Sequence, residues 1–174
     1  MHDTARERTG HSAARHLDGT IYRKVAGHWL TGVAIITSTS PQALPVGLTM
    51  NAVAPLSLVP PQFLVNLDLK SDTYSAIGAT RHFCINFLRA DQGAVCAAFA
   101  RKGADKFKSV AHHSGVLGVP IIEGCIAHVE CSVSAMHTSG DHVIVIGDAY
   151  HGAADGGEPL VYYTSGFRQL APCL

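Results

Sequence analysis

The sequence predicts a mainly β domain, built as an antiparallel barrel with a few short helices packed outside it. Three observations lead to this class. Apolar, β-branched runs recur along the chain, turn signals rich in Gly, Pro, Ser and Asn separate them, and the predicted strands seldom alternate with helices. A parallel doubly wound sheet requires that alternation, so the antiparallel architecture is favoured.

The individual elements follow from apolar spacing. Apolar residues at helical spacing predict a first helix over residues 18–29, with Asp18 or Thr20 as its cap. Residues 33–39 are continuous and β-branched, which predicts a buried strand. The remaining elements are expected as strands at residues 45–58 (broken near Asn51 and Pro55), 62–68, 83–88, 127–136, 142–150 and 160–164, helices at 71–80 and 91–100, and a basic loop or short helical turn at 101–108.

Length and composition fit one domain over residues 18–174, preceded by a flexible polar tail over residues 1–17. Of the 174 residues, 47% are apolar and only 15% are charged, so a second subunit is expected to cover part of the surface. Thirteen basic and thirteen acidic residues leave no net charge, which argues against a nucleic-acid partner. No apolar run approaches the roughly 20 residues of a membrane helix. The tail lacks a secretory signal, and the five irregularly spaced cysteines suggest reduced thiols in the cytoplasm.

The segment Gly47-Leu48-Thr49-Met50-Asn51 lies at the predicted strand break. It places a hydroxyl and a carboxamide beside a glycine that permits close approach of a backbone. A flavin ring needs such a site, because its pyrimidine edge carries donors and acceptors while its benzenoid end needs an apolar wall. From these residues alone, a barrel strand with a bulge and two outward polar side chains is the commoner arrangement.

Two segments carry groups suited to a phosphate. Lys70-Ser71-Asp72-Thr73 precedes a predicted helix, whose free backbone N–H groups, together with the hydroxyls and the lysine charge, suit an anion. An ordinary helix N-cap accounts for the same residues. Residues 101–107 place three cations beside Gly103, either as a second phosphate clamp or as a solvated basic loop.

Gly140-Asp141-His142 opens another apolar strand. An imidazole at the mouth of this strand could contact a nicotinamide or flavin edge, and a turn followed by a half-buried histidine is the alternative. The rings of Phe99, Tyr163 and Phe167 could stack on a ring system or pack in a core or an interface. The sequence has no standard glycine-rich nucleotide loop, no Cys-x-x-Cys and no His-x-x-x-His, so no metal site is expected.

In their order and spacing, these motifs resemble those of the short-chain flavin reductases. The similarity covers roughly residues 20–170 of this chain. Besides the segments around Asn51 and His142, it includes Gly32-Val33, Pro60-Pro61, Ser71, Asn86, Gln92, Phe99-Ala100, Asp105-Lys106-Phe107, Gly124, Leu160 and Phe167.

The resemblance implies a homodimeric split β-barrel that uses NADH or NADPH to reduce FMN or FAD and supplies reduced flavin to a separate monooxygenase. By position, the residues implied to line the isoalloxazine are Thr49, Met50, Asn51 and Ala52. Those implied on the phosphate side are Ser71, Ala100, Arg101 and Lys106, with Asp68 and Phe107 nearby. His142 is implied as the catalytic residue, where nicotinamide or incoming flavin stacks, and Phe167 would close that pocket.

Met50 departs from the family pattern, because most relatives have a small or β-branched residue before the motif's asparagine. This departure leaves the fate of the flavin open between a released product and a bound prosthetic group. The alternatives are therefore a protein with tightly bound FMN that reduces a corrinoid, a ferric chelate or another protein, and a flavin-binding barrel without catalysis.

Overall fold

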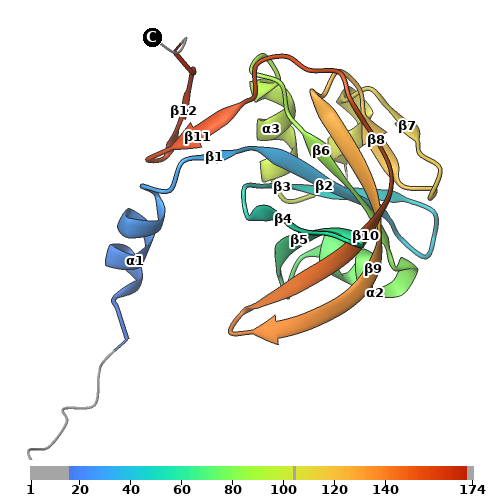
Figure 1. The fold of residues 1–174 in the computed structure, drawn as a ribbon, viewed down its shortest axis with the longest axis horizontal. Coiled ribbons are helices and arrows are strands. Elements are labelled where there is room, and N and C mark those ends of the chain that lie inside the picture. The colour runs from blue at the N-terminus through green and yellow to red at the C-terminus, as the bar shows by residue number, and fades with distance from the viewer. Residues whose placement is uncertain (1–15, 104, 172–174) are drawn as a thin grey trace, which may run out of the picture.

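The computed structural model describes residues 16–103 and 105–171 (Figure 1). The predicted tail therefore lies outside the described residues, apart from its last two. The strands are β1 Thr31–Gly32, β2 Ala34–Thr39, β3 Pro45–Met50, β4 Val53–Leu58, β5 Pro61–Asp68, β6 His82–Phe87, β7 His112–Ser114, β8 Pro120–Ile122, β9 Ala127–Ser139, β10 His142–Ala154, β11 Val161–Tyr163 and β12 Gly166–Arg168. The helices are α1 Gly19–Ala26, α2 Asp72–Thr80, α3 Gly93–Ala100 and the 3₁₀ helix η1 Asp105–Ser109.

A seven-stranded sheet in the order β3-β2-β6-β9-β10-β5-β4 forms the centre of the molecule, and all its pairs are antiparallel. The mainly β, antiparallel character predicted from the sequence is confirmed. The two edge strands, β3 and β4, are consecutive in the chain and are joined only by Asn51 and Ala52. A small sheet, β1-β11-β12, lies beside α1 and adjoins the main sheet where β1 leads through Val33 into β2 (Figure 1).

Alternation along β5 separates a core face from an outer face. Val65 and Leu67 are fully buried in the main core, together with Ile36, Ile85 and Val145. Because successive side chains of a strand point to opposite faces, Leu64, Asn66 and Asp68 project from the other side of β5. The core therefore fixes which side chains of β5 are available to a ligand.

A second layer, formed by α3, η1 and the β7–β8 hairpin, packs on β2 and β6 through a second apolar cluster. Asn86 on β6 is completely buried between the layers. Its Nδ2 donates to Ile35 O and Thr37 Oγ1 (3.1 Å each), and its Oδ1 accepts from Ile122 N (2.8 Å). The buried Glu130 carboxylate accepts from two backbone N–H groups of the β7–β8 loop. Polar side chains thus fix this hairpin to the sheet.

Side-chain caps begin two of the helices. Asp18 Oδ1 accepts from Thr20 N (2.8 Å), so Asp18 rather than Thr20 is the N-cap of α1. Ser71 Oγ accepts from Tyr74 N (3.1 Å) and caps α2, which confirms the N-cap interpretation of that segment. Helix α1 ends at Ala26 instead of residue 29 and buries none of its side chains. It stands apart from the sheet in Figure 1.

The described cysteines, Cys84, Cys96, Cys125 and Cys131, are all free and buried. Cys125 precedes β9, so it does not share a strand with Cys131. Burial raises the pKa of the Cys125 thiol to about 11 and that of the Cys131 thiol to about 12. Within the described ranges, no helix combines the length and apolar character required to cross a bilayer.

Candidate functional site

The break between β3 and β4 is the centre of the candidate site. Thr49 Oγ1 donates to Cys96 O on α3 (2.6 Å), and Met50 packs against the main core. Asn51 and Ala52 are exposed, and Ala52 O accepts from Asn66 N (3.1 Å). Of the four residues expected to line a flavin ring, two therefore direct their side chains into the protein and two face outward at the break.

The glycine of this motif has a packing role. A Cβ added to Gly47 would lie 2.9 Å from Phe99 Cε1 and 3.0 Å from Ile36 O. The close approach that the sequence indicates at Gly47 is therefore made by α3 of the same chain, whose Phe99 ring crosses β3 at this point.

A groove of about 680 Å³ begins at the break and runs between α1, β1 and the outer side of β4 and β5. This volume is typical of small-molecule sites. Three aromatic rings line it, and the sequence analysis did not assign any of them to a site: Tyr22, Trp29 and Phe87. Asn51, Ala52, Thr31 and Asn66 also line the groove, and the polar oxygens of Thr31 and Asn66 are buried there without a hydrogen-bond partner among the described residues.

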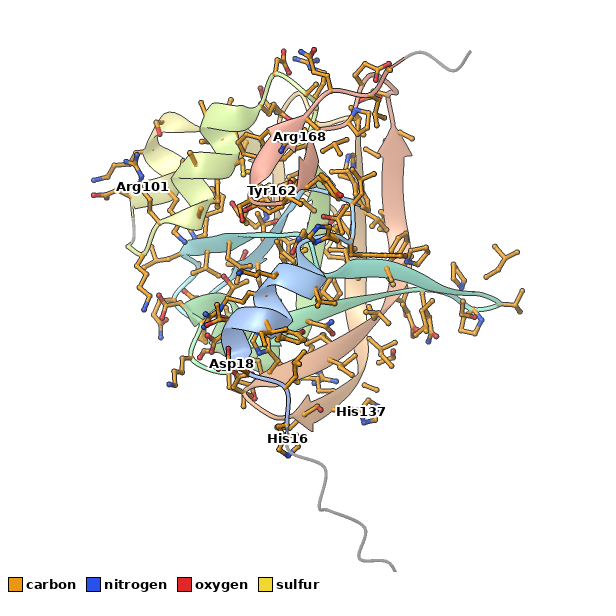
Figure 2. All side chains as sticks on the ribbon, turned by 90° about the vertical axis from the view of Figure 1, so that its left-hand side faces the viewer. His16, Asp18, Arg101, His137, Tyr162 and Arg168 are labelled. Atoms are coloured by element: carbon orange, nitrogen blue, oxygen red, sulfur yellow. The ribbon has the colours of Figure 1, made fainter. Side chains whose placement is uncertain are left out.

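A second, cationic cavity of about 270 Å³ lies at the C-terminal end of α3, where Arg101, Lys102 and Lys106 line it together with one acid, Asp105. Lys106 Nζ donates to Gly47 O (2.9 Å) and Phe99 O (3.3 Å), so its ammonium is fixed between β3 and α3. Burial lowers the pKa of Lys106, and the charge of Asp72 at the start of α2 opposes this shift. Arg101 is exposed and points outward at the end of α3 (Figure 2).

The other residues expected on the phosphate side have local roles. Asp68 Oδ1 accepts from Lys70 N (2.7 Å), and Ser71 caps α2. Ala100 is the last residue of α3. Phe107 is 8% exposed and makes an edge-to-face contact with Phe99, their ring centroids being 4.8 Å apart. Phe107 therefore lies behind the cationic cavity, in the second apolar cluster.

His142 and Asp68 are cross-strand neighbours in the pairing of β10 with β5. His142 Nδ1 lies 2.7 Å from Asp141 Oδ1, and this hydrogen bond lowers the pKa of Asp141. Phe167 lies on β12, where it makes an edge-to-face contact with Tyr162. In Figures 1 and 2, β12 and the turn between β9 and β10 lie at opposite ends of the molecule, so one copy of the chain does not bring His142 and Phe167 together.

The donor set of the site fits a flavin nucleotide. An aromatic-lined groove suits a planar ring, and a cavity with one fixed and two exposed cations suits the phosphate attached to it. The groove begins at Asn51, directly after β3, and Lys106 of the cavity donates to Gly47 O on β3. This arrangement is that of a β domain suited to a nucleotide cofactor.

The comparisons with known proteins identify the family. The model of the flavin reductase like domain matches residues 26–171. The reductase component of 4-nitrophenol 4-monooxygenase/4-nitrocatechol 2-monooxygenase of Rhodococcus opacus is 38% identical over 156 residues, which cover 90% of this chain and 83% of that protein. An FMN reductase (NADH) of Agrobacterium fabrum is 36% identical, with 86% and 85% covered. The chain therefore belongs to the flavin reductase-like family, as the resemblance indicated.

Solved structures agree with this assignment. Nitrilotriacetate monooxygenase component B from Mycobacterium thermoresistibile superposes with a TM-score of 0.84 at 35% identity, covering 88% of this chain and 87% of that one. An NADH:FAD oxidoreductase of Streptomyces globisporus, solved in complex with NAD and FAD fragments, gives a TM-score of 0.84 at 29% identity and covers 91% of this chain and 98% of that one.

Proposed function

We propose that this protein is an NAD(P)H:flavin oxidoreductase, which transfers hydride from NADH or NADPH to FMN or FAD and supplies the reduced flavin to a separate monooxygenase. The observation that carries the proposal is an aromatic-lined groove that begins at Asn51, directly after β3, together with a cavity whose Lys106 ammonium is fixed on Gly47 O of β3. The curated relatives named as reductase components of monooxygenases support the partner.

We assign the site residues to two parts of the flavin, its ring and its phosphate. The backbone at 49–52 and the side chains of Asn51 and Ala52 line the isoalloxazine, and Ser71, Ala100, Arg101 and Lys106 bind the phosphate side. Asp68 orients the turn before Ser71, and Phe107 supports Phe99 and the loop that carries Lys106. The bound flavin supplies the hydride-accepting ring, and the protein contributes alignment and charge.

Turnover of free flavin tests this function directly. In an anaerobic absorbance assay, the protein should oxidise NADH or NADPH with saturable dependence on added FMN, FAD or riboflavin. A stoichiometric yellow protein that is inert to free flavin would instead indicate tightly bound FMN serving another acceptor, such as a corrinoid, a ferric chelate or a protein. Flavin binding without any nicotinamide oxidation would indicate a barrel without catalysis.

His142 contacts the nicotinamide or the flavin edge in this proposal, and no side-chain acid or base is required. His142→Ala should lower kcat/KM for the nicotinamide by a modest factor, about tenfold, because it removes one positioning contact. Steady-state kinetics at saturating flavin measures this effect, with His137→Ala on the neighbouring strand as the control. Complete loss of activity in His142→Ala would contradict a positioning role.

We further propose that the protein is a homodimer with the site at its interface. We also propose that the main sheet closes into a split barrel. The apolar side of α1 supports the dimer, because Ile21, Tyr22 and Val25 are 50%, 63% and 64% exposed and Trp29 is 78% exposed. A second copy would also explain how His142 and Phe167 serve one pocket. Sedimentation velocity should give a dimer for the wild-type chain and for Lys24→Glu, and a monomer for Val25→Glu. A wild-type monomer would exclude this arrangement.

The free cysteines support a cytoplasmic location.

A further inference from the structure

Two polar atoms in the groove are buried without a hydrogen-bond partner among the described residues. They are Thr31 Oγ1 on β1 and Asn66 Oδ1 on β5. Such atoms are rare in folded proteins, because the hydrogen bonds that they lose to water on burial are not replaced, which costs free energy. Both residues line the same groove, from opposite elements. One bound group that interacts with both oxygens would satisfy them together.

The chemistry of that group follows from the two oxygens. The oxygen of Asn66 only accepts a hydrogen bond, whereas the hydroxyl of Thr31 can donate one. A primary carboxamide offers an N–H and a C=O side by side, which is the matching pair. The rings of Tyr22, Trp29 and Phe87 along the groove suit the flat face of an aromatic ring. Together these features suit an aromatic carboxamide. The N3–H and C4=O of a flavin form the same pair, but the proposed function places that edge at residues 49–52.

We propose that Asn66 and Thr31 recognise the carboxamide of the nicotinamide. Asn66 Oδ1 accepts from its N–H, and Thr31 Oγ1 donates to its C=O. This inference rests on the proposed function, because the nicotinamide nucleotide is the aromatic carboxamide that a flavin reductase uses.

The position of Asn66 supports the assignment. Its backbone N–H donates to Ala52 O (3.1 Å), so it adjoins the break that lines the flavin ring. Its side chain lies on the same face of β5 as Asp68, the cross-strand neighbour of His142. Asn66 therefore lies between the break and His142, which is where the proposed function places the nicotinamide against the flavin.

Two dinucleotides that differ at one group test the proposal. NAD carries the full carboxamide, and its 3-acetylpyridine analogue keeps the C=O but has a methyl in place of the NH₂. Calorimetric titration of the FMN-saturated, full-length protein gives each affinity. Asn66→Leu should weaken NAD binding about tenfold and leave the analogue within about twofold, because only NAD loses a hydrogen bond. Thr31→Val should weaken both ligands about equally, because both retain the C=O.

Gln62→Leu is the matched control for Asn66→Leu. Gln62 lies on the same face of β5 but does not line the groove, so its replacement should leave both affinities unchanged. Equal losses for the two dinucleotides in Asn66→Leu, or no loss, would overturn the proposal. Unchanged affinities with weakened dimerisation in sedimentation would also overturn it, because a second copy would then satisfy the two oxygens. Failure of the wild-type protein to reduce free flavin would count against the proposed function, whereas the binding pattern tests Asn66 and Thr31 alone.

Discussion

Replacing Lys106 by alanine is expected to weaken FMN binding by about 10- to 100-fold and to leave riboflavin binding within about twofold. Lys106 Nζ is fixed by Gly47 O and Phe99 O at the edge of the cationic cavity, where it can meet a phosphate without reorganising. A hydrogen bond to a charged group contributes about 1.5–3 kcal/mol, and each 1.4 kcal/mol is a factor of about ten. Equilibrium titration of the two flavins measures the difference, because riboflavin has the ring without the phosphate.

Lys102 supplies the matched control for Lys106. It lines the same cavity but is exposed, so Lys102→Ala should change FMN affinity by less than about threefold. An equal loss of FMN and riboflavin affinity in Lys106→Ala would show that Lys106 only holds β3 against α3.

The pH dependence of FMN binding should carry the signature of Lys106. Burial lowers its pKa in the free protein, and a bound phosphate would raise that pKa again by favouring the charged form. A group whose pKa rises on binding contributes its full effect below the pKa of the free state. Above the second pKa of the FMN phosphate, about 6, FMN affinity should therefore be constant up to the lowered pKa of Lys106 and fall as the pH rises from there toward the pKa of the complex. Lys106→Arg should abolish this decline, because the guanidinium stays charged throughout.

The largest loss of stability is expected from Asn86→Ala, at about 3 kcal/mol. The substitution leaves the backbone N–H of Ile122 and the Ile35 carbonyl without their side-chain partner, in a position that is completely buried. Each buried group left unsatisfied costs about 1–3 kcal/mol. Chemical denaturation at a fixed protein concentration measures the free energy of unfolding, which is concentration-dependent if the protein dimerises.

Gln62→Ala is the control for Asn86→Ala. Gln62 makes one hydrogen bond, from Nε2 to Asp148 Oδ1 (2.7 Å), at a half-buried position, so its loss should cost less than about 1 kcal/mol. Similar losses in the two variants would mean that the layer formed by β7 and β8 is not held by Asn86.

Sequence patterns predicted the long elements well, because burial on a sheet leaves a clear signature. The run at residues 33–39 and the run at 62–68 correspond to β2 and β5, whose centres are fully buried. The strands β1, β7, β8 and β12 were missed, since segments of two or three residues are too short to show a period.

Site residues were predictable from the sequence where they belong to a turn motif or carry a charge. They were less predictable where their role depends on which strands pair in the sheet. Lys106 stood out because it is a cation beside a glycine turn, and the structure places it in a cavity. Asn66 carries no signal in the sequence, because a polar residue within a strand gains meaning only when its neighbours across the sheet are known. Phe107 was expected near the phosphate, but its ring is buried against Phe99, since aromatic side chains in such a motif also support the fold.

The burial of the cysteine thiols affects how readily the protein is oxidised. Reduced flavin that leaves an enzyme reacts with oxygen and generates hydrogen peroxide, which oxidises thiolates to sulfenic acids. Burial keeps Cys125 and Cys131 protonated at neutral pH, and a protonated thiol is a poor nucleophile toward peroxide. These two thiols should therefore resist oxidation by the hydrogen peroxide that released flavin generates, as long as the protein stays folded.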